Sequence, residues 1–106
     1  MSEMEKPGPR MDPIENLDRV IHEPARLKIM TYLYVVESGD FIYLMRAANL
    51  TRGNLSSHMS KLEEAGYIDV KKEFVDRKPL TMLSLTPKGR TALETYRATM
   101  AQIIKS

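Results

Sequence analysis

The 106-residue sequence contains no cysteine. This absence excludes a disulfide framework, a thiolate metal site and a thiol redox switch. The sequence also lacks an apolar run of the roughly 20 residues that a membrane-spanning helix needs. The opening stretch MSEMEKPGPRMDP has no apolar signal core, so nothing in it indicates export. From length and composition we expect one small domain, located in the cytoplasm.

Histidine is scarce, and the patterns typical of catalytic sites are missing. His22 and His58 are the only histidines, and no His/Glu cluster, nucleophile elbow or glycine-rich phosphate loop accompanies them. His22 precedes a predicted helix start and His58 flanks a predicted buried stripe, so packing explains both positions. We expect neither enzyme activity nor a metal or other cofactor.

Positive and negative charges are nearly balanced overall, with a formal net charge of +2. Their distribution is uneven. Residues 46–90 hold nine lysines and arginines against five acidic residues, an excess of +4, whereas residues 1–45 hold five against eight. A local basic region is the electrostatic footprint of a protein with a polyanionic partner. An ordinary solvated surface can carry the same excess.

Apolar spacing and capping residues predict the elements of the fold. Pro24 suits the first turn of a helix, and Asp40 and Thr51 suit N-caps. Gly39 and Gly66 suit the C-terminal ends of helices. In chain order, the predicted elements are a short helix at 13–21, helices at 24–36, 41–48 and 52–65, strands at 67–75 and 80–85, and a last helix from 87 to about 104.

This order of elements is that of the winged helix-turn-helix. Two compact helices joined by a tight turn precede a β-hairpin, and a long helix follows it. The predicted fold class is mainly α with a small antiparallel hairpin, α+β, dimerising through its terminal helices. We expect a flexible tail at 1–12, a DNA-binding domain at 13–86 and a C-terminal dimerisation helix at 87–106.

The predicted helix at 52–65 has an unusual polar face. Leu55, Met59 and Leu62 form its apolar stripe, and short hydrogen-bonding side chains occupy the opposite face. Glycine, asparagine and serine are poor helix formers, but small side chains allow close approach to a partner and can meet base edges and phosphates. The alternative is a solvated, serine-rich helix. The candidate DNA-binding residues on this helix are Thr51, Arg52, Asn54, Ser56, Ser57, Ser60 and Lys61.

The predicted hairpin loop, DRKP at 76–79, adds a second candidate contact within a wing at 75–79. Arg77 and Lys78 place two cations at a tip that Pro79 stiffens. An arginine on a thin loop can enter the minor groove, where narrow A/T-rich tracts concentrate negative potential. An ordinary solvated turn is the alternative.

The last predicted helix carries an apolar seam at spacings of three and four. Thr86 caps this helix and Pro87 opens it. Two heptads are too short for an isolated coiled coil, so we expect the seam to pack against the copy in a second chain and against the short N-terminal helix. The alternative is a stripe that packs on its own domain. The candidate dimerisation residues are Leu93, Tyr96, Met100 and Ile103, with Ile104 beside them.

Three motifs together resemble the winged-helix regulators of the multiple-antibiotic-resistance and arsenic-resistance types, MarR and ArsR. EPARLKIM at 23–30 is similar to their opening helix, and DRKPLTMLSLTPKGR at 76–90 is similar to their wing and the entry to their dimer helix. The motifs cover roughly residues 20 to 97. LSSHMSKLEEAGYI at 55–68 matches their Ser-x-His-Leu-x-x-Leu-x-x-Ala-Gly pattern through Ser56, His58, Met59, Leu62, Ala65 and Gly66.

The resemblance implies a homodimer whose two recognition helices read adjacent major grooves of a near-palindromic operator. It places Ser56 and His58 at or near the DNA backbone and Arg77 at the wing. The chain departs from the family in lacking the cysteines that many members use to sense metals or oxidants. The resulting hypothesis is a sequence-specific, double-stranded-DNA-binding transcriptional regulator. The alternative is a winged-helix module that binds protein through the same face.

Overall fold

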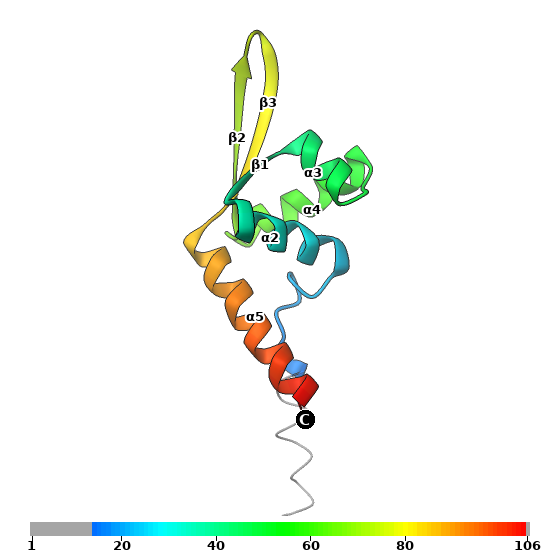
Figure 1. The fold of residues 1–106 in the computed structure, drawn as a ribbon, viewed down its shortest axis with the longest axis vertical. Coiled ribbons are helices and arrows are strands. Elements are labelled where there is room, and N and C mark those ends of the chain that lie inside the picture. The colour runs from blue at the N-terminus through cyan, green and yellow to red at the C-terminus, as the bar shows by residue number, and fades with distance from the viewer. Residues whose placement is uncertain (1–13, 106) are drawn as a thin grey trace, which may run out of the picture.

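A computed structural model describes residues 14–105; the tail expected at 1–12 and Ser106 lie outside the described residues. Figure 1 shows a central group of helices, a hairpin that projects from one end of it and a long helix that leads to the other end. The described elements are α2 (Pro24–Val36), β1 (Ser38–Asp40), α3 (Phe41–Ala47), α4 (Arg52–Glu64), β2 (Ile68–Val75), β3 (Lys78–Leu85) and α5 (Pro87–Lys105).

Helix α2 has the predicted bounds. Pro24 occupies its first turn, and the carboxylate of Glu23 caps it by accepting a hydrogen bond from the Arg26 backbone N–H at 2.7 Å. A proline is tolerated there because the first helical N–H groups have no partner within the helix. The buried face of α2 consists of Ile29, Met30 and Leu33.

The end of α2 differs from the prediction, because Gly39 is not its C-terminal cap. Glu37 is the C-terminal cap instead, with a positive φ of 72°, and its N–H donates to the Leu33 carbonyl at 2.7 Å. Gly39 lies in β1 opposite Leu83. A side chain there would meet Tyr32 Cε2 at 3.2 Å, so this glycine serves close packing.

The short helix predicted at 13–21 is wrong over most of its length. Of its described residues, 14–21, Ile14 and Glu15 alone are helical, and the chain from 16 to 23 consists of turns, bends and irregular backbone. The Asp18 carboxylate accepts hydrogen bonds from the N–H groups of Val20 and Ile21 at 2.9 and 3.3 Å. An aspartate that binds nearby backbone in this way competes with helix formation.

The helix-turn-helix formed by α3 and α4 follows the predicted caps. The Asp40 carboxylate accepts from two N–H groups at the start of α3. The Thr51 hydroxyl accepts from the Asn54 N–H at 3.1 Å at the start of α4. The two helices end one residue earlier than predicted, and Gly66 follows α4 with φ 81°. Its positive φ is the reason a glycine suits this position.

The sheet has three antiparallel strands in the order β1-β3-β2. Strand β1 was not predicted from the sequence, and it pairs with β3 over only three residues. The loop predicted at 76–79 is shorter, because Lys78 and Pro79 belong to β3. Asp76 and Arg77 alone form the turn, with φ 52° and 68°. Two successive positive φ values identify a type I′ turn, which matches the twist of the strands it joins.

The core lies where α2, α4, α5 and the sheet meet. Leu55 and Leu62 of α4 are fully buried, as the apolar stripe predicted, and Met59 is partly buried beside them. The four helices from α2 to α5 and both long strands contribute, so these helices hold the hairpin at its base. The core residues are Ile21, Ile29, Met30, Leu33, Phe41, Leu44, Leu55, Leu62, Ile68, Leu83, Leu93 and Tyr96.

Helix α5 is fixed to the turn that follows α4. The Thr86 hydroxyl accepts from the Gly89 N–H at 2.9 Å, which confirms the predicted cap, and donates to the Gly66 carbonyl at 2.7 Å. The Thr86 N–H donates to the Tyr67 carbonyl at 3.0 Å. None of the described helices is long and apolar enough to cross a membrane.

Candidate nucleic-acid interface

The polar face of α4 is open to solvent over its whole length. It is not turned into the protomer, and Ser56, at its edge, is half-buried. A side chain added at Gly53 would meet nothing within 4 Å, so the protein's own fold does not require glycine there. The exposed residues on or beside this face are Thr51, Arg52, Gly53, Asn54, Ser57, Ser60 and Lys61.

Arg52 begins α4 and rests on α3. Its guanidinium carbon lies 5.6 Å from the centroid of the Phe41 ring, within the range of a cation–π interaction. The contact restricts the side chain while the residue stays exposed. A restrained guanidinium with free donors is suited to a guanine edge or a phosphate.

The start of α4 and the hairpin share one surface. Lys72 of β2 and Thr81 of β3 are paired and line a shallow hollow of about 170 Å³ together with Arg52 and Ser56 of α4. Phe41 and Met59 form the rest of its lining. The sequence alone could not place Lys72 in one hollow with Arg52, because that arrangement depends on how the hairpin packs. It adds a cation between the helix and the hairpin tip.

The hairpin tip carries the two predicted cations. Arg77 and Lys78 are exposed, and among residues 14–105 neither side chain has a hydrogen-bond or ion-pair partner. Arg77 has φ 68°, a left-handed conformation that costs a residue other than glycine about 1–2 kcal/mol. Backbone strain of this kind concentrates at functional positions.

His58 connects α4 to the start of α2. The Arg26 Nη1 donates to His58 Nδ1 at 3.1 Å. Because arginine can only donate, Nδ1 is the acceptor and the ring is neutral in this arrangement. Glu23 Oε1 lies 3.9 Å from the same nitrogen and would form an ion pair only with a protonated ring. The side chain of His58 is 19% exposed, so it lies at the edge of the polar face.

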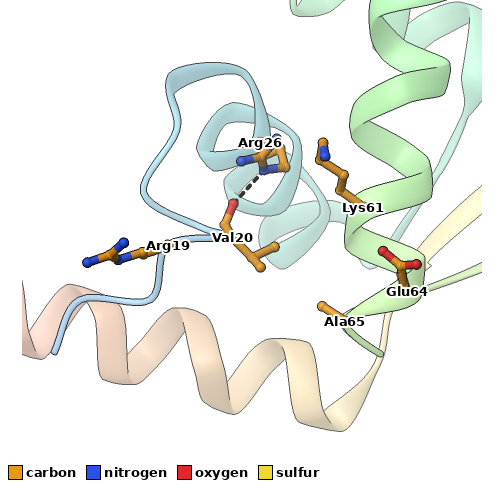
Figure 2. Close-up of a pocket in the computed structure, with 6 residues that line it drawn as sticks. All are labelled: Arg19, Val20, Arg26, Lys61, Glu64 and Ala65. Carbon is orange, nitrogen blue, oxygen red and sulfur yellow. Dashed lines mark hydrogen bonds between the residues drawn. The ribbon is translucent and has the colours of Figure 1, made fainter.

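A pocket of about 330 Å³ lies beside the second half of α4 (Figure 2). Arg26 holds one wall in place, because its Nε donates to the Val20 carbonyl at 2.6 Å. Figure 2 shows Arg26 beside Lys61 and the Arg19 side chain directed away from both. Neither arginine could be assigned to this pocket from the sequence, because its lining depends on the turns at 16–23 and on how α2 packs on α4. The pocket is lined by Arg19, Val20, Arg26, Lys61, Glu64 and Ala65.

Two long-range hydrogen bonds hold the segment before α2. The Tyr67 hydroxyl donates to the Asp18 carboxylate, and burial together with this bond raises the pKa of Tyr67 to about 12. The phenol therefore stays protonated at neutral pH and remains a donor. His22 Nδ1 lies 2.8 Å from the Tyr96 hydroxyl. No group of three or more potential metal ligands occurs among residues 14–105.

The predicted dimerisation seam divides into two parts. Leu93 and Tyr96 are 1% and 6% exposed and belong to the protomer's own core. This part of the stripe therefore packs on its own domain, which was the alternative prediction. Met100 is partly buried against the core, Ile103 is half-buried and Ile104 is 75% exposed. Only the second half of the seam is therefore accessible to a second chain.

Comparison with known proteins identifies the family. Residues 25–104 match the model of the winged helix DNA-binding domain. The uncharacterized protein MJ0432 of Methanocaldococcus jannaschii is 36% identical over 88 residues, which are 83% of this chain and 96% of that protein.

Solved structures agree with this match. A transcriptional regulator homologue from Pyrococcus horikoshii OT3 superposes with a TM-score of 0.83 at 27% identity, over 91% of this chain and 94% of that one. A MarR family transcriptional regulator from Silicibacter pomeroyi shares the fold, with a TM-score of 0.60 at 17% identity over 92% and 67% of the two chains. The chain belongs to the winged helix DNA-binding domain family.

Proposed function

We propose that the protein is a transcriptional regulator that binds double-stranded DNA sequence-specifically as a homodimer in the cytoplasm. The observation that carries this proposal is the exposed face of small, hydrogen-bonding residues on α4, which shares one surface with a cationic hairpin. A protein-binding helix would more often expose aromatic residues, and α4 contains no phenylalanine, tyrosine or tryptophan.

In this proposal α4 lies in the major groove. Arg52, Asn54, Ser57, Ser60 and Lys61 contact base edges and phosphates. The hydroxyl of Thr51 and the free N–H groups of the first turn of α4 bind a phosphate, because a helix N-terminus carries a partial positive charge. Ser56 and His58, at the edge of the face, lie toward the DNA backbone.

The hairpin contacts the adjacent minor groove. Arg77, at the turn, enters the groove, and Lys78 binds a flanking phosphate. The free donors of both side chains support this assignment. The positive φ of Arg77 supports the assignment as well, because glycine would occupy this turn position with less strain than arginine does.

The second half of the α5 seam joins two protomers. Ile104, with Ile103 and Met100 beside it, packs on the partner's copy. A two-fold axis there presents two copies of α4 to one side of a duplex. Their operator is then near-palindromic, with half-sites in adjacent major grooves.

Salt dependence of duplex binding tests the proposal. Lys61, Lys72, Arg77 and Lys78 of two protomers supply eight cations. If all of them neutralise phosphates, log K falls with log salt at a slope of about −7. The measurement is a fluorescence anisotropy titration of a labelled random-sequence duplex between 50 and 200 mM salt, roughly the range over which such losses are largest. Binding that does not weaken with salt, or no binding, contradicts DNA recognition and favours a protein-binding module.

A further inference from the structure

Phe74, near the end of β2, is the most exposed large apolar side chain among the described residues, at 77%. No sequence pattern assigned this residue a role. Single exposed apolar residues are common on protein surfaces, so its exposure alone indicates nothing. Its position on the hairpin is the informative feature.

The strand register places Phe74 on the face of the hairpin that adjoins α4. Residues two apart in a strand lie on one face, and paired residues share a face. Phe74 pairs with Pro79 and Lys72 pairs with Thr81, and the latter pair lines the hollow with Arg52. Phe74 therefore continues this surface toward the tip, beyond the end of the core.

The neighbouring residue lies on the other face. Val75 lines a separate hollow with Asp40, Ile42 and Leu80. It is also exposed, at 49%. The hairpin thus carries two adjacent exposed apolar residues, of which only Phe74 is on the face that adjoins α4.

The surroundings of the Phe74 ring match a nucleic-acid groove. Lys72 lies on the same face and Arg77 lies at the turn, whereas Lys78 pairs with Val75 and so lies on the other face. A minor groove has phosphates along its rims and sugars and base edges between them, and apolar side chains enter it in many DNA-binding proteins. An aromatic ring with one cation on each side of it along the hairpin, Lys72 and Arg77, complements that arrangement.

We propose that the Phe74 ring is an apolar contact in the minor groove, beside Arg77. The inference rests on the proposed DNA binding and adds a residue whose contribution is not electrostatic. An apolar contact releases no counterion, whereas a cation at a phosphate does. The two kinds of contact therefore differ in how their loss changes salt dependence.

The test compares Phe74→Ala with Val75→Ala, its neighbour on the opposite face. The probe is a labelled duplex selected from a random pool by the unaltered protein. Phe74→Ala should weaken binding by about tenfold and leave the slope of log K against log salt unchanged. Val75→Ala should leave both unchanged. Arg77→Ala should weaken binding and make the slope shallower by up to about one for each protomer's Arg77 that contacts a phosphate.

Each other result overturns the inference. Equal affinity of the Phe74→Ala and Val75→Ala proteins removes Phe74 from the interface while leaving the proposed function intact. A weaker affinity with a shallower slope means that Phe74 only positions the neighbouring cations. Failure of the unaltered protein to bind any duplex overturns the proposed function itself. Because Phe74 is exposed, both variants should melt at the temperature of the unaltered protein.

Discussion

Replacing Gly89 with alanine lowers the free energy of unfolding by about 3 kcal/mol, the upper end of the usual cost of overpacking. A Cβ at this position would lie 2.1 Å from the carbonyl oxygen of Tyr67 and 2.9 Å from its carbonyl carbon. These are backbone atoms, so no side-chain rotation relieves the contact. The same carbonyl accepts the Thr86 N–H that fixes the start of α5.

Gly53→Ala is the matched control for this substitution. A Cβ at Gly53 meets nothing within 4 Å, and alanine forms helix better than glycine does. Its free energy of unfolding should be unchanged or higher by up to about 1 kcal/mol. Urea unfolding of the three proteins, followed by circular dichroism, provides the comparison. A Gly89→Ala protein as stable as the Gly53→Ala protein contradicts the close approach of α5 to Tyr67.

Replacing Arg52 with alanine should weaken binding to a selected duplex by about 1–3 kcal/mol, which corresponds to roughly 5- to 150-fold, and relax the preference at one base position. Arg52 is exposed at the start of α4, and its one described contact is with the Phe41 ring. The loss of that exposed cation–π contact costs the fold at most about 1 kcal/mol, so the protein remains folded.

The control for Arg52→Ala is Arg97→Ala. Arg97 is an exposed residue of α5, the helix that leads away from the hairpin end of the molecule (Figure 1). Its loss removes the same charge without removing a groove contact. Competition titrations with selected and random duplexes measure both affinity and preference. If Arg52→Ala behaves as Arg97→Ala does, α4 does not read bases through its first turn.

The helices could be predicted because their boundaries depend on local chemistry. Asp40 and Thr51 cap α3 and α4 through side-chain bonds to N–H groups two or three residues away. Gly66 provides the positive φ that follows α4. Apolar spacing on α4 then separated its buried stripe from its exposed face, so most of the candidate interface was identified correctly as surface.

The errors occurred where distant residues decide the conformation. The Asp18 carboxylate is held by the hydroxyl of Tyr67, 49 residues away, which favours turns over the predicted short helix. Strand β1 has only three residues and no apolar alternation. It forms because its backbone pairs with the edge of β3. Helix α2 ends at Glu37 and not at Gly39, because Gly39 pairs with β3 as part of β1.

Parts of the candidate site were invisible in the sequence because they are tertiary contacts. Arg26 reaches His58 across 32 positions, and no local pattern marks such a pair. Phe74 is exposed because the hairpin extends beyond the core. The sequence of β2 predicts a strand but does not show how far that strand extends past the core. Leu93 and Tyr96 have the spacing of a dimer seam but pack within the protomer.

Selection of bound sequences from a random duplex pool tests most directly whether α4 reads DNA. The protein should enrich one sequence with two-fold symmetry, whose half-sites are about one helical turn, roughly 10 base pairs, apart. Repeating the selection with the Arg52→Ala protein should lose one base preference in each half-site. A pool that stays random after successive rounds, with folded protein present, would contradict sequence-specific recognition by this surface.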